Sequence, residues 1–235
     1  QFDFINPGAK SLAMGGAFSG LADDATATFA NPAGLTQLGA SEASFELRRT
    51  RVSTPFLESG RLSGTISNQG IDTIQGPQFG TSVGQHSGVG FAAGVYVHPS
   101  RKWVIAAYRH ELVRIDQAFL STGVFQKAPE ELTSRRDTAQ ALERSMNVTG
   151  YGAAGSYKVR PNISIGASLA SYSLDFESVV RRFDTAGFLG APRTDVVFGR
   201  TTQIGDEVSL APTIGVVVEE SADAEATLIQ RTRIG

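Results

Sequence analysis

The sequence predicts an all-β chain: an antiparallel transmembrane β-barrel, with about seven strands present, preceded by a small N-terminal plug of short helices. Through most of the 235 residues, apolar and polar side chains alternate with the period of two that is typical of strands. The predicted strands are roughly 10 to 17 residues long, against about 5 or 6 for a typical soluble strand. Connections between them alternate between very short and very long, as in outer-membrane barrels.

The N-terminal stretch, residues 6–38, is small, apolar and rich in glycine. Its glycines weaken any continuous helix by roughly 1 kcal/mol each, so only short helical turns are expected. Asn31 before Pro32 predicts an N-cap with proline at the first helical position, starting a brief helix that ends near Leu38. Asp23 and Asp24 are expected in the turn before it. Residues 1–40 are therefore predicted to form the plug, and residues 41–235 the strands.

Seven strands are expected after the plug, because the apolar alternation restarts after each break in the pattern. They are predicted at residues 42–52, 89–98, 103–118, 146–159, 163–177, 207–218 and 224–235. In the fifth strand the apolar phase shifts by one residue near Leu169 and Ala170, as a β-bulge or a bend would produce. Pro212 is irregular in the sixth strand because it has no N–H to donate to a ladder.

The connections sort into two classes by length. Short turns are predicted at 99–102, 160–162 and 220–223, and long loops at 53–87, 119–142 and 179–206, the middle one with helical character around 130–144. Short periplasmic turns and long extracellular loops are typical of outer-membrane barrels, whereas a soluble sandwich, the alternative, has no reason to sort its loops in this way. Because seven strands do not make an even-numbered barrel, the chain is expected to be half of a barrel of about fourteen strands, or a spliced or truncated form of one.

Composition excludes several other classes of protein. The formal net charge of −2 gives no basic surface for nucleic acid, and the absence of cysteine excludes disulfides and thiolate metal sites. No stretch approaches the roughly 20 apolar residues of a membrane-spanning helix. The chain opens at Gln1 without a methionine or a signal peptide, which suggests a mature N-terminus after export, or a trimmed chain.

Motifs for catalysis or cofactor binding give no coherent site. The run Gly150-Tyr-Gly-Ala-Ala-Gly155 fits a dinucleotide fingerprint, and the run from Gly88 to Ala93 nearly does, but neither opens a helix. Small residues facing a crowded lumen explain both. The three histidines are far apart in sequence, and no Gly-x-Ser-x-Gly elbow is present. No metal, cofactor or catalytic residue is therefore expected.

Charged and aromatic side chains suggest contacts with a membrane. The arginine clusters at 48–51, 135–136 and 181–182 are interpreted as solvated rim charges, with attraction for anionic lipopolysaccharide or a fatty carboxylate as the alternative. Aromatic rings favour the level of lipid headgroups. The candidates for such an interface belt are Trp103, Tyr108, Tyr151, Tyr157 and Tyr172.

Three blocks of the N-terminal stretch carry a family resemblance. Gly8–Phe18, Ala22–Ala25 and Asn31–Leu35 together resemble the N-terminal signature of the FadL-type transporters of long-chain fatty acids and hydrophobic compounds in Gram-negative outer membranes. The resemblance implies a fourteen-stranded barrel in which the N-terminal segment is a hatch inside the lumen. The hatch motif would then be Asn31, Pro32, Ala33, Asp23 and Asp24, and the candidate ligand-binding aromatics are Phe2, Phe4, Phe18 and Phe29.

The expected function is passive transport of hydrophobic molecules, such as long-chain fatty acids, across the outer membrane. No chemical step is involved, so the protein is not expected to be an enzyme. Expected partners are outer-membrane lipid and lipopolysaccharide, a hydrophobic small molecule and a protein at the extracellular loops. The alternative is a non-conducting barrel that anchors a partner in a secretion or surface complex. A hydrophilic porin is disfavoured because a plug would obstruct its pore.

Overall fold

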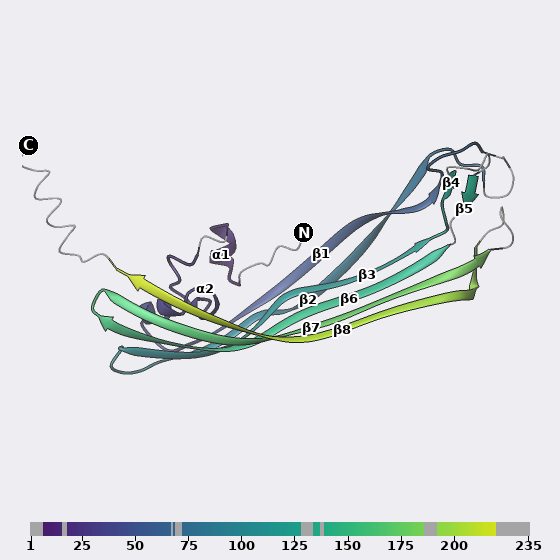
Figure 1. Ribbon diagram of the computed structural model, residues 1–235. Coiled ribbons are helices and arrows are strands. Elements are labelled where there is room, and N and C mark those ends of the chain that lie inside the picture. The colour runs from purple at the N-terminus through teal and green to yellow at the C-terminus, as the bar shows by residue number, and fades with distance from the viewer. Residues whose placement is uncertain are drawn as a thin grey trace, which may run out of the picture.

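A computed structural model of the chain describes residues 7–15, 18–66, 68, 72–127, 134–136, 139–185 and 192–219. Six antiparallel strands form one long, curved sheet in which the spatial order follows the chain order (Figure 1). They are β1 (Glu42–Gly60), β2 (Pro77–Val97), β3 (Trp103–Ser121), β6 (Gln140–Arg160), β7 (Ile163–Thr185) and β8 (Pro192–Val218). β4 (Phe125–Lys127) and β5 (Ser134–Arg136) form a second, two-stranded sheet. The all-β antiparallel prediction is confirmed, and the main sheet is open, with β1 and β8 at its edges.

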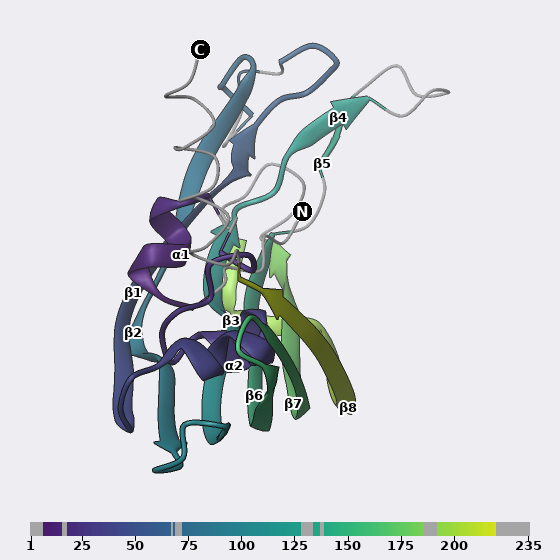
Figure 2. The same cartoon turned by 90° about the vertical axis from the view of Figure 1, so that its left-hand side faces the viewer.

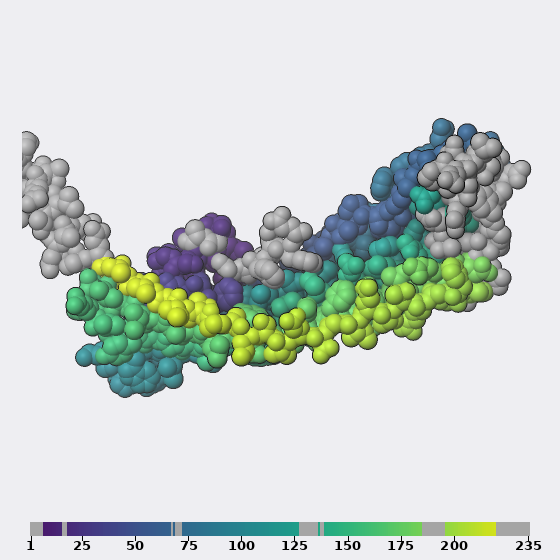
Figure 3. Space-filling view, in the orientation of Figure 1, coloured from purple at the N-terminus to yellow at the C-terminus, as the bar shows by residue number. Residues whose placement is uncertain are grey.

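The N-terminal segment, of which residues 7–15 and 18–40 are described, lies on the concave face of the sheet (Figure 2). It contains α1 (Ala9–Ala13), α2 (Ala27–Ala30) and the 3-10 helix η1 (Pro32–Gln37), which contacts β6, β7 and β8. The predicted cap is confirmed: the Asn31 side chain accepts a hydrogen bond from the Ala33 amide at 3.2 Å, and Pro32 is the first helical residue. The space-filling view shows this segment filling part of the hollow of the sheet (Figure 3).

The strands extend well beyond their predicted ends, with lengths from 19 to 27 residues. The bounds predicted for the long loops are therefore wrong. Most of 53–87 belongs to the β1–β2 ladder, and within 119–142 and 179–206 the described residues are largely strand, including 140–144, where helical character was expected. The reason is that apolar and polar side chains do not alternate regularly along these parts. The backbone ladder continues there without the apolar alternation that reveals a strand in sequence.

The turns between strands fall where short connections were expected. Residues 98–102 join β2 to β3, and Pro161 and Asn162 join β6 to β7. The third predicted turn, 220–223, and the seventh strand, 224–235, lie outside the described residues. Pro212 lies in the ladder of β8 opposite Leu169, and β8 is an edge strand, where a missing donor is tolerated.

β7 has no bulge near Leu169, so the bulge expected as one of two alternatives is wrong. Its pairing with both neighbours is continuous from Ser164 to Arg182. The apolar phase shifts because the apolar residues change face. Ile165 and Leu169 point away from the N-terminal segment and are 47% and 53% exposed, whereas Phe176 and its apolar neighbours lie on the concave face.

The ladder between β2 and β3 is short. It runs only from Phe91 opposite His110 to Val97 opposite Val104. Beyond that point the β1–β2 hairpin leaves the edge of β3, as Figures 1 and 2 show. Individual bonds connect the two from there on: the Ser82 hydroxyl donates to the Ala118 carbonyl at 2.7 Å, and the Thr122 amide to the Glu58 carbonyl at 2.9 Å. We call this part, where the two strands lie together without a backbone ladder, the β2–β3 split.

The hydrophobic core lies between the N-terminal segment and the concave face. Phe18 and Leu35 of the segment, and Phe91 and Val104 of the sheet, are almost completely buried in it. Each such side chain contributes about 1.5–3 kcal/mol of burial. The segment is therefore part of the folded core and not an appendage.

Candidate functional site

Two glycines on the concave face form a seat for η1. Gly166 of β7 and Gly215 of β8 lie directly opposite each other in the ladder. A Cβ atom at Gly166 would lie 2.5 Å from the carbonyl carbon of Pro32, and one at Gly215 would lie 3.0 Å from Asn31 Cγ. We call Gly166 and Gly215 the glycine seat, because only bare backbone lets η1 approach this closely.

Hydrogen bonds hold the segment on the glycine seat. Asn31 Nδ2 donates to the Ser19 carbonyl at 2.9 Å and to the Val216 carbonyl at 3.4 Å. The Thr36 hydroxyl donates to the Ala33 carbonyl at 3.0 Å and lies 2.7 Å from the buried Ser164 hydroxyl. The structure thus places Asn31, Pro32 and Ala33 directly against β7 and β8, where they can fix the position of the segment.

Asp23 and Asp24 make their contacts within the N-terminal segment. Asp23 forms an exposed ion pair with Lys10 at 2.6 Å, which contributes little to stability. Asp24 Oδ1 accepts from the Thr26 amide at 2.8 Å and from its hydroxyl at 2.5 Å, and so caps the turn before α2. The described contacts of both carboxylates stay within the segment.

The candidate ligand-binding aromatics occupy different places. Phe18 is fully buried in the core, so its ring offers no surface to a ligand in this conformation. Phe29 packs edge-on against His110, with ring centroids 4.7 Å apart. Phe2 and Phe4 lie outside the described residues.

Tyrosine rings cover the glycines that mimic a dinucleotide fingerprint. A Cβ atom at Gly152 would lie 2.5 Å from Tyr108 Cζ, and one at Gly150 would lie 2.5 Å from Tyr172 Cδ1. The two tyrosine side chains lie next to each other on the concave face. These glycines lie in the middle of β6, so the interpretation as small residues in a crowded interior agrees with the geometry.

A group of apolar side chains lies on the concave face beyond the N-terminal segment. It consists of two rows across β3, β6 and β7, which the ladder pairing aligns. The rows are Val113, Val148 and Leu174, then Ile115, Met146 and Phe176. All six are partly exposed. We call them the inner apolar patch. The sequence analysis missed it, although the phase shift in β7 was its signal.

The outer face of the sheet carries a different apolar surface, which we call the outer apolar belt. Its most exposed members, from 63% to 84% exposed, are Phe45, Leu47, Tyr151, Val208, Leu210, Ile214 and Val218. Polar residues follow it on each strand, for example Arg49 on β1 and Asp206 on β8. The belt lies nearer the short turns than the inner apolar patch does. Of the aromatic candidates, Trp103, Tyr151 and Tyr157 face outward, whereas Tyr108 and Tyr172 face inward.

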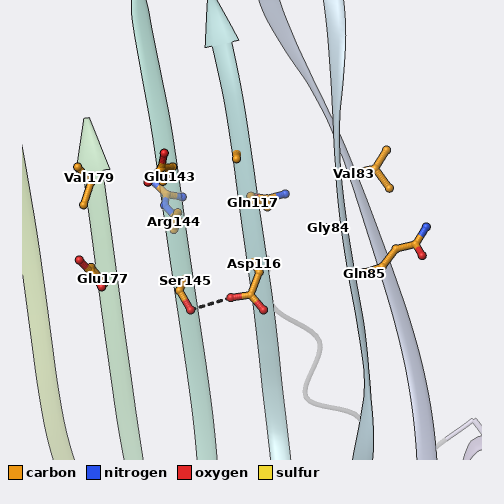
Figure 4. A pocket seen from close by; sticks show the side chains of 11 residues that line it. Val83, Gly84, Gln85, Asp116, Gln117, Glu143, Arg144, Ser145, Glu177 and Val179 are labelled. Atoms are coloured by element: carbon orange, nitrogen blue, oxygen red, sulfur yellow. Dashed lines mark hydrogen bonds between the residues drawn. The ribbon is translucent and has the colours of Figure 1, made fainter. Parts of the chain in front are cut away.

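Beyond the belt, the outer face has a groove of about 460 Å³ with a mixed polar and apolar lining across β2, β3, β6 and β7 (Figure 4). Ser145 donates to Asp116 at 2.7 Å within it, and Glu143 on its rim pairs with Arg181 at 2.8 Å. Among the described residues, no group of histidine, aspartate or glutamate side chains has a metal-binding arrangement. The groove has charged side chains beside apolar ones such as Val83 and Val179, and no metal-binding arrangement among the described residues.

A compact cluster holds the far end of the sheet together. Arg61 and Asp72 form a buried ion pair, and the Arg61 guanidinium lies 5.0 Å from the centre of the Phe125 ring. Arg136 lies 5.9 Å from the same ring and donates to the Thr122 carbonyl at 2.6 Å. Burial lowers the pKa of Arg136 from its ordinary value. Arg136 is thus a buried structural residue, not the solvated rim charge expected from the sequence.

Neither the protein-family models, the curated proteins nor the solved structures contain a match to this chain. In the part of the chain that the structure describes, no helix is both long and apolar enough to cross a bilayer. The fold and the site define the chain as an open antiparallel sheet with a helical segment seated in its hollow. Function has to be inferred from these residues.

Proposed function

We propose that this chain forms the wall and the hatch of an outer-membrane β-barrel that lets hydrophobic molecules, such as long-chain fatty acids, pass. The observation that carries the proposal is the change of face along the strands. Nearer the short turns, the outer face is apolar; further along, the concave face is apolar. A wall in lipid that guides an apolar molecule inside needs both surfaces.

The outer apolar belt has dimensions that suit a bilayer. On β8 it runs from Val208 to Val218, about 33 Å along the strand at about 3.3 Å per residue. At the usual strand tilt of about 40°, this corresponds to about 25 Å, the height of the apolar band of an outer-membrane barrel. Arg49 and Arg51 follow the belt on β1, where they are placed to contact lipid or lipopolysaccharide phosphates.

The inner apolar patch favours a hydrophobic cargo over water and ions. Water-filled barrels have polar interiors. Here six apolar side chains face the hollow beside the N-terminal segment, and each methylene of a cargo buried on them contributes about 0.8 kcal/mol. The segment obstructs the hollow, so it acts as a hatch that Asn31, Pro32 and Ala33 hold in place.

Closure of the barrel requires further strands. Both edges of the main sheet, β1 and β8, carry unpaired backbone groups in the described structure. Such groups cannot remain unpaired in the apolar part of a bilayer. About fourteen strands in total, as the family resemblance implies, would close the wall around the segment.

Uptake of a labelled long-chain fatty acid into liposomes tests this proposal. Protein-containing vesicles should take up the label faster than protein-free vesicles. Leu174→Asp places a charge in the inner apolar patch and should lower the flux by about tenfold or more, because apolar contact worth about 1.4 kcal/mol or more is lost. Ile204→Asp is the matched control: it is 75% exposed, lies on the outer face beyond the belt, and should leave the flux unchanged. Equal flux with and without the protein would refute transport.

A second candidate is a non-conducting barrel that anchors a partner protein. Exposed apolar side chains near the β4–β5 end favour it: Leu62, Ile74 and Phe79 are 56%, 44% and 68% exposed. Under this alternative a partner would co-purify with the protein and be lost from a Leu62→Ser/Phe79→Ser variant, and the liposomes would show no flux.

A further inference from the structure

A chain of polar contacts links the start of the N-terminal segment to β1 and β3. The Gly8 amide donates to Glu46 Oε2 at 2.6 Å. Glu46 Oε1 accepts from Arg48 Nε at 2.9 Å and pairs with Arg48 Nη2 at 2.8 Å. Arg48 Nη1 in turn donates to the backbone carbonyl of Glu111 at 3.4 Å. Two side chains, Glu46 and Arg48, therefore connect the segment to the Glu111 backbone.

From Glu111 the contacts continue across the β2–β3 split. Glu111 Oε1 lies 3.4 Å from His86 Nε2 on β2, and Oε2 lies 3.4 Å from Arg109 Nη2. The Arg109 guanidinium donates to the Val89 carbonyl on β2 at 2.5 Å. Side chains thus bridge the two strands at the place where their backbone ladder has just ended.

Backbone irregularities meet at this same level. The register of β1 against β2 shifts between Glu46 and Leu47, and that of β3 against β6 shifts between Glu111 and Val113. The last backbone pair between β2 and β3, Phe91 with His110, is next to both. Bulges turn side chains away from their regular direction. Here Arg48 contacts both the Glu46 carboxylate on β1 and the backbone carbonyl of Glu111 on β3.

The groups in this chain are poorly exposed. The side chains of Glu46, Arg48 and Glu111 are 20%, 15% and 10% exposed, and that of His86 is 21% exposed. Ion pairs with so little solvent contact are screened less than surface pairs, and removing one partner leaves the other charge poorly compensated. Loss of a contact at Glu46 should therefore weaken the contacts at Glu111, and the reverse.

We propose that Glu46 and Glu111 are the two ends of one latch, which couples the seating of the N-terminal segment to closure of the β2–β3 split. When the segment leaves, Glu46 loses the Gly8 donor, its pair with Arg48 rearranges, and the hold of Arg48 on the Glu111 backbone weakens. The contacts of Glu111 with His86 and Arg109 then loosen as well. This inference rests on the proposed function only in taking the segment as the part that moves.

The test uses Glu46→Gln, Glu111→Gln and the double variant of the whole protein in detergent, with two readouts. Hydrogen exchange of the amides at 9–15 reports seating of the segment. Because the chain has no cysteine, spin labels at Ser87→Cys and Arg114→Cys report the width of the split. Glu111→Gln should speed exchange at 9–15 by about tenfold, and Glu46→Gln should broaden the distance distribution across the split. Glu143→Gln, in an exposed pair with Arg181 on the outer face, should change neither readout.

Three outcomes would overturn the latch. Glu111→Gln could widen the split without faster exchange at 9–15, Glu46→Gln could release the segment without widening the split, or the double variant could show strictly additive effects. If Glu111→Gln does not fold, His86→Gln removes the contact on the β2 side and must give the same two changes. Neither readout needs a cargo, so a protein without flux can still show the coupling, and a conducting protein can lack it.

Discussion

Replacing Gly166 by alanine tests the glycine seat most directly. The new Cβ would lie 2.5 Å from the Pro32 carbonyl carbon and 2.8 Å from Ala33 Cα, both backbone atoms. The segment must therefore lift by about 1 Å to restore ordinary contact. Overpacking of this kind costs about 1–3 kcal/mol, and lifting stretches the Thr36–Ser164 bond, worth about 0.5–1.5 kcal/mol. The expected total of about 2–4 kcal/mol shifts the equilibrium toward the released segment by about 30-fold to 1000-fold.

Hydrogen exchange of the α2 and η1 amides, residues 27–37, measures this shift. Exchange in Gly166→Ala should be faster by about the same factor, provided that the segment opens and closes faster than it exchanges. Gly155→Ala is the matched control: Gly155 is also a strand glycine, but a Cβ there would meet nothing within 4 Å. Rates in Gly166→Ala that equal those of Gly155→Ala would refute the seat.

Three further changes probe the segment, the belt and the rim. The hydroxyls of Thr36 and Ser164 are 2.7 Å apart, so Thr36→Cys/Ser164→Cys can form a disulfide between the segment and β7. Oxidation should lock the segment and stop fatty acid uptake, and a reductant should restore uptake. Continued uptake after complete oxidation would contradict a moving hatch. Ile214→Arg should weaken insertion into lipid by about 2–4 kcal/mol in urea titrations, whereas Ile204→Arg, beyond the belt, should cost below about 1 kcal/mol. Arg51→Gln should reduce the anionic lipid retained in native mass spectrometry by about fivefold, since one phosphate contact is worth about 1 kcal/mol; unchanged retention argues against a lipid contact there.

The features that sequence predicted well are local ones. The cap at Asn31 depends on Pro32 and Ala33, its immediate neighbours, so the residues that decide it are adjacent in the chain. The same holds for the turn at Pro161 and Asn162. Strand ends were predicted poorly because backbone hydrogen bonds hold a ladder together, and these bonds leave no pattern in the side chains. Thr54 pairs with Ser82 and Ser59 with Gln78, although neither pair has an apolar side chain to reveal it.

The site depends on residues that sequence separates. Gly166 and Gly215 lie opposite each other only because β7 and β8 pair in one register. The residues around either glycine do not predict this pairing. The inner apolar patch did leave a trace, the phase shift near Leu169. A bulge and a change of face give the same one-dimensional pattern, and only the ladder on both sides of β7 distinguishes them.

The opposed glycines also bear on how the wall is assembled. If β8 slipped by one residue against β7, every side chain of β8 would change sides. Ile214 or Val216 would then occupy the place of Gly215, and its side chain would prevent η1 from docking on the sheet. Docking of the N-terminal segment is thus possible only after β8 has joined β7 in its proper alignment. The N-terminal segment is made before β7 and β8 but would dock after them, and its docking would require that these two strands have paired correctly.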